Sequence, residues 1–180
     1  MESKPSVASL TVKTSHVLPP DTNGHGTLFG GELMAHIDDV AAISATRHAR
    51  KPVVTASTDS VDFLHPVKEG DTICLEAFVT WTHNTSMEVF VKAVTENLLT
   101  GDRKVCTTAF LTMVAIGEDK RPTTVPSVYP ESEEEKLLHE GAPERAALRK
   151  ERRKQSKQVA NSFGTNFPWN EKSRFGKNPF

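Results

Sequence analysis

Polar and apolar positions alternate in five segments of the chain, which is the pattern of β-strands with one buried face. In the third segment, Ile73, Leu75 and Ala77 alternate with polar residues. Turn-forming residues separate the last three segments, so we expect these to form an antiparallel meander. The five segments are residues 8–17, 53–64, 72–82, 86–96 and 103–115.

A different period appears between the first and second of these segments. Residues 31–48 contain no proline and place apolar or small side chains at helical spacing, at Leu33, Met34, Ile37, Val40, Ala41 and Ser44. We predict a long, largely buried helix. One strand, one helix and four further strands indicate an α+β fold, with a long central helix wrapped by a curved antiparallel five-stranded sheet. Because one helix leaves the sheet edges unprotected, we expect the chain to form a dimer.

The composition changes after about residue 118, where charged residues and proline replace the apolar alternation. We predict a globular domain over 6–118, a linker over 119–131, a charged helical extension over 132–160 and a poorly ordered tail over 161–180. Ser132 is a good N-cap for the extension. Gly141 and Pro143 are expected to interrupt it.

Charge and cysteine content remove several function classes. The formal net charge of −1 gives no reason to expect nucleic acid or an anionic membrane as a partner. Cys74 and Cys106 form neither a disulfide framework nor a zinc motif, and the histidines lack metal-ligand spacing. No apolar run resembles a signal peptide or a membrane span. We therefore predict a cytoplasmic protein without a metal.

The chemistry is concentrated where the predicted helix begins. Gly30 and Gly31 precede it, and glycines there let a ligand approach the backbone amides, which can bind an anion or a developing oxyanion. Asp38 lies on the same helix among apolar neighbours, where a carboxylate needs a partner or a polar cleft. Asp39 competes for the same role, because spacing alone does not choose between two positions about 100° apart on a helix.

Three separated stretches resemble the acyl-CoA thioesterases of the hotdog superfamily, over roughly residues 8–116. The first stretch is the run Asn23-x-x-Gly26-x-x-x-Gly30-Gly31-x-x-Met34-x-x-x-Asp38. The others are Val54-Thr55-Ala56-Ser57, with Asp62-Phe63 behind it, and Thr85-Ser86-Met87-Glu88-Val89.

The resemblance implies roles for the residues that match. Asp38 would be the general base or nucleophile, and Asn23 would position water or substrate from the other subunit of a dimer. The Gly31 amide, together with Gly30, would stabilise the oxyanion. Asp39 would then be a structural or surface residue. The reaction would need no cofactor, because coenzyme A is part of the substrate and product.

The resemblance also implies contacts to coenzyme A and a higher assembly. Basic side chains after the domain reach the adenosine 3′-phosphate in some family members. Family members form dimers and often trimers of dimers, so we expect a hexamer. Asn84 stands where many relatives have a basic residue, which departs from the family pattern. The residues expected to bind coenzyme A are Ala56, Ser57, Thr58, Thr85, Ser86, Met87, Arg152 and Arg153.

Two further functions compete with hydrolysis. Hotdog domains also act as acyl-CoA sensors without catalysis, although an intact pair of Asn23 and Asp38 favours an enzyme. A hotdog dehydratase acting on hydroxyacyl thioesters would use a histidine near the helix entry, for which His25 is the candidate. The preferred acyl chain length cannot be read from the sequence, because each methylene contributes only about 1–3 kcal/mol of discrimination.

Overall fold

The computed structural model describes residues 2–163 of the chain. The chain divides into two compact units, Met1–Ala142 and Pro143–Phe180. In order, the elements are β1 (Ser3–Pro5), a 3-10 turn (Ser6–Ser9), β2 (Thr11–His16), a second 3-10 turn (Pro19–Asp21), α1 (Gly30–Ala49), β3 (Val53–Phe63), β4 (Thr72–Thr82), β5 (Ser86–Glu96), β6 (Arg103–Ala115), β7 (Ser127–Tyr129) and α2 (Glu133–Ser162).

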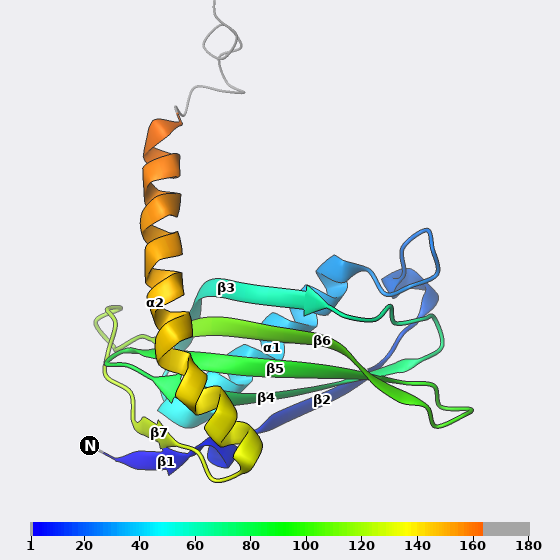
Figure 1. Cartoon of the computed structure of the whole chain (residues 1–180), viewed down its shortest axis with the longest axis horizontal. Coiled ribbons are helices and arrows are strands. Elements are labelled where there is room, and N and C mark those ends of the chain that lie inside the picture. The colour runs from blue at the N-terminus through cyan, green and yellow to red at the C-terminus, as the bar shows by residue number, and fades with distance from the viewer. Residues whose placement is uncertain (1, 164–180) are drawn as a thin grey trace, which may run out of the picture. The chain divides into compact units, whose positions relative to one another are not determined.

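The first unit is a five-stranded antiparallel sheet with α1 packed against one face (Figure 1). The strand order is β2-β4-β5-β6-β3, so the meander of β4, β5 and β6 occupies the centre. Leu33, Ile37 and Val40 of α1 enter the core, together with Leu75 and Leu111 of the sheet. Burying each such side chain contributes about 1.5–3 kcal/mol. The α+β class and the five strands around one helix are confirmed.

The first strand begins later than the sequence pattern predicts. Residues 8–10 do not join β2, because Ser6–Ser9 form a 3-10 turn. The buried Ser9 hydroxyl donates to the Ser6 carbonyl at 2.7 Å and accepts the Val79 amide at 2.8 Å. The Ser9 side chain thus accepts the hydrogen bond of the Val79 N–H in β4, which a backbone carbonyl would accept if the first strand continued.

The predicted linker contains a strand that the sequence pattern does not indicate. β7 pairs in parallel with β1, with Ser3 opposite Ser127. Each of these strands has three residues, and a stretch that short carries no readable alternation. The domain boundaries at 118 and 131 stay predictions.

The charged extension is one continuous helix, so the expected interruption at Gly141 and Pro143 is wrong. Pro143 removes one backbone donor, but the surrounding Glu, Ala, Leu, Arg and Lys residues are strong helix formers. Ser132 caps this helix as expected. Its hydroxyl accepts the Glu135 amide at 3.1 Å, and the Glu135 carboxylate accepts the Ser132 amide at 3.0 Å. Most of the predicted tail, residues 164–180, lies outside the described residues.

The helix α1 buries a narrower stripe than expected. Met34, predicted in the core, is 44% exposed. It follows Leu33 by about 100° around the helix and falls on the flank of the stripe that contacts the sheet. Over residues 2–163, neither long helix is apolar enough to cross a membrane.

His48, near the end of α1, joins the helix to the segment before β7. Its side chain is fully buried, and Nε2 lies 3.0 Å from the Pro126 carbonyl oxygen, so Nε2 carries the proton. Nδ1 has no hydrogen-bond partner among the described residues. Burial lowers the pKa of His48, and the Pro126 carbonyl only partly opposes this. The folded protein therefore holds His48 neutral.

This arrangement predicts a loss of stability in acid. Because the pKa of His48 is lower in the folded than in the unfolded chain, the unfolded chain binds more protons as the pH falls below about 6.5. The free energy of unfolding should then decrease by up to about 1.4 kcal/mol per pH unit from this group. Urea unfolding of wild type and His48→Gln at fixed protein concentration, between pH 7 and 5, measures the difference. Parallel curves would contradict the prediction.

Candidate active site

The loop before α1 is closed by the side chain of Asn23. The backbone N–H of Asn23 donates to the Thr27 carbonyl at 2.8 Å, and the side-chain nitrogen of Asn23 donates to the Thr27 hydroxyl at 3.0 Å. The side-chain oxygen accepts the His25 amide at 2.9 Å. Gly26 has a φ of 69°, a left-handed conformation that favours glycine. Asn23 therefore shapes a tight turn with both ends of its carboxamide.

The first turn of α1 presents backbone donors. The residue before the helix is Phe29, and no side chain caps the helix there. Gly30 and Gly31 are the first two helical residues, whose amides have no acceptor within a helix. A Cβ atom on Gly31 would lie 2.6 Å from Cε1 of Phe29, closer than real contacts allow. A larger residue at this position would therefore require the Phe29 ring to move.

Asp38 and Asp39 contact different strands, which lie on opposite sides of α1. Asp38 Oδ1 accepts a hydrogen bond of 2.7 Å from the Thr55 hydroxyl of β3. Asp39 pairs with Lys13 of β2 at 2.8 Å, on an exposed surface. One carboxylate is oriented by a hydroxyl, and the other forms an ordinary surface ion pair. Helical spacing alone does not predict this difference between the partners of the two carboxylates.

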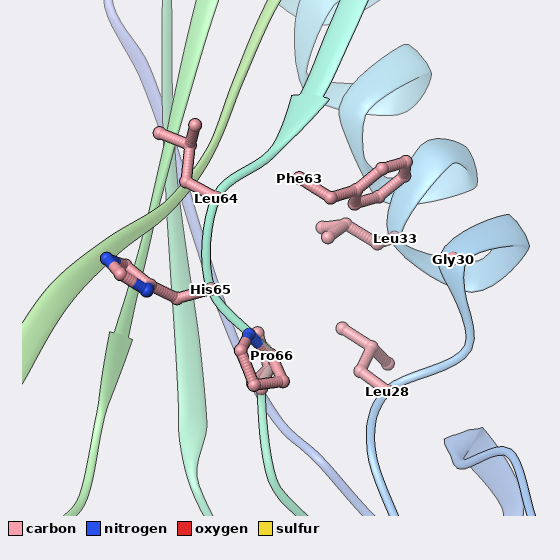
Figure 2. A pocket seen from close by; sticks show the side chains of 8 residues that line it. Leu28, Gly30, Leu33, Phe63, Leu64, His65 and Pro66 are labelled. Carbon is pink, nitrogen blue, oxygen red and sulfur yellow. The ribbon is translucent and has the colours of Figure 1, made fainter. Parts of the chain in front are cut away.

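An apolar pocket of about 340 Å³ opens beside the start of α1. Figure 2 shows Leu28, Leu33 and Phe63 in the space between the first turn of α1 and the segment after β3. The side chains of Leu64 and His65 lie on the far side of that segment. Phe63 is 55% exposed, and it lies 3.6 Å from a Cβ placed on Gly30. Such a lining suits a hydrocarbon chain. The pocket is lined by Leu28, Gly30, Leu33, Phe63, Leu64, His65, Pro66 and Val67.

The two segments expected to bind coenzyme A lie at the same end of the sheet. Thr55 of β3 and Met87 of β5 are both register partners of Met113 in the strand between them. The stretches 56–58 and 85–87 are therefore separated by one strand. Met87 is fully buried, so its side chain belongs to the core. Ser57 pairs with Thr112, on the face of the sheet opposite α1.

The remaining expected site residues fall in the second compact unit. Arg152 and Arg153 lie on α2, and both are exposed. Residues 2–163 hold no group of three or more His, Cys, Asp or Glu side chains able to bind a metal ion. Thr55, by contrast, was not expected at the site. Its only signal was its place in the Val54-Thr55-Ala56-Ser57 stretch, because the strand pattern does not show which face it takes.

Comparison with known proteins identifies the family. The model of the thioesterase superfamily matches residues 25–101. An uncharacterized acyl-CoA thioester hydrolase of Bacillus subtilis, YkhA, is 55% identical over 161 residues, which is 89% of this chain and 94% of the relative. A solved structure of an apo-hexameric acyl-CoA thioesterase has a TM-score of 0.83 and 53% identity, and the match covers 84% of this chain and 97% of that one.

A second solved structure carries ligands. It is an acyl-CoA hydrolase of Staphylococcus aureus in complex with butyryl coenzyme A, coenzyme A and coenzyme A disulfide, with a TM-score of 0.85 and 44% identity over 88% of this chain and 97% of that one. Three more structures of that hydrolase carry alanine in place of an aspartate, an asparagine and a threonine. The asparagine lies 15 residues before the aspartate, and the threonine lies 17 after it.

The fold and these matches define a hotdog-fold thioesterase. Within that superfamily, the chain belongs to the family of acyl-CoA thioester hydrolases.

The contact at Gly31 gives a prediction about the helix start. In Gly31→Ala the Phe29 ring has to rotate away from the new methyl group, and that methyl group narrows the approach to the first-turn amides. We expect thioester hydrolysis to slow by about 10-fold or more. Gly24→Ala is the matched control in the same loop, because nothing lies within 4 Å of its Cβ. Steady-state kinetics and thermal unfolding measure both variants, and wild-type rates in Gly31→Ala would refute the prediction.

Proposed function

We propose that this protein hydrolyses fatty acyl-CoA to a free fatty acid and coenzyme A, with Asp38 as the general base or nucleophile. The observation that supports this most directly is the hydrogen bond from Thr55 to Asp38. Because Oδ1 accepts the hydroxyl proton, Oδ2 is the oxygen left to act on water or on the thioester carbon. An oriented carboxylate beside an exposed helix face is suited to general base catalysis.

The proposed reaction balances with water alone. As a base, Asp38 removes a proton from water while the water oxygen attacks the carbonyl carbon. The Gly31 amide, with Gly30, donates to the oxyanion of the tetrahedral intermediate. Collapse of the intermediate breaks the carbon–sulfur bond, and the proton held by Asp38 passes to the departing thiolate of coenzyme A. Asn23 positions the water or the substrate, and no cofactor enters any step.

The spacing of three residues supports these assignments. Asn23 lies 15 residues before Asp38, and Thr55 lies 17 residues after it. These intervals equal those between the substituted asparagine, aspartate and threonine of the Staphylococcus aureus hydrolase. We therefore assign Thr55 to the site as the residue that orients the Asp38 carboxylate.

We further propose that each active site is formed by two chains. Gly31 and Asp38 lie seven residues apart on α1, which is a rise of about 10 Å. A carboxylate attacking a carbonyl directly, while that carbonyl accepts from the Gly31 amide, would have to span this rise. Two antiparallel copies of α1 avoid the problem, because the Asp38 of one chain can face the Gly31 and Asn23 of the other.

The exposed side of α1 is suited to such a contact. Small side chains lie at helical spacing on the same side of α1 as Asp38, and they would let a second helix approach closely. They are Gly31, Ala35 and Ala42. Met34 and Ile43 are more than 40% exposed beside them. A second copy would cover these apolar groups. The hexameric relatives support a trimer of dimers as the full assembly.

Coenzyme A is proposed to lie along the end of the sheet where the stretches 56–58 and 85–87 come together. Backbone groups and the hydroxyls of Thr58, Thr85 and Ser86 are the polar groups available there. Arg152 and Arg153 would bind the adenosine 3′-phosphate. The acyl chain would enter the apolar pocket beside Gly30. A cytoplasmic location without a membrane or nucleic-acid partner stays a prediction.

The role of Asp38 is tested by comparison with its neighbour. Asp38→Asn should lower thiol release from acyl-CoA by at least about 100-fold, because no group of matching basicity replaces the carboxylate. Asp39→Asn loses only an exposed ion pair with Lys13 and should stay within about twofold of wild type. Thiol release from a series from acetyl- to palmitoyl-CoA measures both variants, and light scattering checks the assembly.

Two results would contradict the proposal. Equal activity of Asp38→Asn and wild type would remove Asp38 from the chemistry. A wild type that binds acyl-CoA and releases no thiol would be a sensor, and formation of an enoyl product from a hydroxyacyl-CoA would indicate a dehydratase.

Sharing of the site between chains predicts complementation. Asn23→Ala and Asp38→Ala should each be inactive alone. When the two variants are unfolded together and refolded as a mixture, half of the dimers are mixed, and each mixed dimer has one intact site. About one quarter of wild-type activity should return. A mixture that stays inactive, although native mass spectrometry shows mixed dimers, would place both residues of a working site in one chain.

A further inference from the structure

A carboxylate on β3 holds two hydroxyl groups on the face of the sheet opposite α1. Asp59 Oδ1 accepts a hydrogen bond of 2.6 Å from the Ser57 hydroxyl. Asp59 Oδ2 accepts one of 2.6 Å from the Thr112 hydroxyl of β6. Bonds this short between hydroxyls and a carboxylate are charge-assisted, and each is stronger than a bond between neutral groups. Asp59 thus ties its own strand to the neighbouring one.

The register of β3 against β6 shifts twice, once before this carboxylate and once at the carboxylate itself. One shift falls between Thr55 and Ser57 and the other between Thr58 and Ser60. Each leaves one residue of β3 without a register partner, and the second of these is Asp59 itself. Extra residues of this kind are β-bulges, which change the face that the following side chains take.

The first bulge decides where Thr55 points. In a regular strand, Thr55 and Ser57 would share a face. Here Thr55 is opposite Met113, which is buried in the core on the α1 side, whereas Ser57 is opposite Thr112 on the other side. The bulge therefore lets one strand place a hydroxyl on Asp38 and, two residues later, a hydroxyl on Asp59.

The tie matters because β3 is an edge strand. Within residues 2–163, β3 pairs only with β6. An edge strand has backbone bonds to one neighbour only, and each bulge interrupts that ladder. The bonds that Asp59 accepts from Ser57 and Thr112 join the extra residue of the second shift to its own strand and to β6.

We propose that Asp59 is a positioning residue for thioester hydrolysis. It holds the bulged register of β3, and that register aims the Thr55 hydroxyl at the Asp38 carboxylate. This inference rests on the proposed function, in which Asp38 performs the chemistry. In this role Asp59 does not act on the reacting atoms, and its effect on the rate passes through Thr55.

The test uses substitutions at both ends of one hydrogen bond. Asp59→Ala and Thr112→Val each remove the bond, and Thr112→Val keeps the shape of the side chain. We expect both to lower kcat by about 10-fold with KM within about twofold of wild type, because a small displacement of an orienting group slows the chemical step. Thr112→Ser keeps the hydroxyl and should restore kcat. Asp62→Asn, an exposed carboxylate on the same strand, is the matched control.

A double-mutant cycle shows the route of the effect. If Asp59 acts through Thr55, then Thr55→Ala with Asp59→Ala should be no slower than Thr55→Ala alone. Independent, multiplying losses would overturn the inference. So would a wild-type kcat in Asp59→Ala and Thr112→Val with a lowered midpoint of thermal unfolding, since Asp59 would then stabilise the sheet only.

The two proposals can fail separately. Full activity in Asp38→Asn would remove the proposed base whatever Asp59 does. Loss of activity in Asp38→Asn, with unchanged kcat in Thr112→Val, would retain the base and overturn the role of Asp59. If Asp59→Ala does not assemble, the pair Thr112→Val and Thr112→Ser decides the question alone, with light scattering as the check on the oligomer.

Discussion

The structure depends on the single face that α1 can bury against the sheet. Leu33, Ile37 and Val40 form that face, and the fully buried Ala41 and Ala45 let the helix lie close to the strands. Rotating the helix by one residue, about 100°, would turn a carboxylate into the core, where an unpaired charge costs several kcal/mol. Apolar burial and charge exclusion thus select the same rotation of the helix.

That rotation also determines what each carboxylate can do. With the apolar stripe held by the sheet, Asp39 is directed to the side of β2, where Lys13 neutralises it. Asp38 is directed to the side of β3, where a neutral hydroxyl orients it without removing its charge. The packing of the core therefore gives the two neighbouring carboxylates different partners, a hydroxyl for one and an ammonium group for the other.

The sequence pattern predicts the elements well where burial is one-sided and long. The bounds of β4, β5 and β6 agree with the alternation, because their inner residues, such as Leu75 and Leu111, face one continuous core. The pattern fails where a distant contact decides. Ser9 replaces a strand bond through its side chain, and β1 pairs with a segment more than 120 residues away. Neither partner is visible from local periodicity.

The sequence predicts the part of the candidate site around α1, but not the part on β3. Gly30, Gly31 and Asp38 belong to a motif within one stretch of chain, so the sequence alone is enough to propose them. Thr55 could not be assigned to the site in the same way. Whether it faces Asp38 depends on a bulge, and the bulge depends on a carboxylate that bonds to β6. A one-residue difference in register would place Thr55 on the opposite face of the sheet.

This dependence explains why the edge strand needs an internal tie. β3 carries the orienting hydroxyl, and its outer edge is also the edge that a second chain could join. If a partner strand alone fixed the register, the side chains of β3 would take their faces only after assembly. Asp59 fixes the register of β3 within one chain, through Ser57 and Thr112. The Thr55 hydroxyl therefore already lies 2.7 Å from Asp38 Oδ1 in the single subunit. In the proposed dimer, assembly would bring together preformed halves of a site, which costs less conformational entropy than ordering the strand at the moment of pairing.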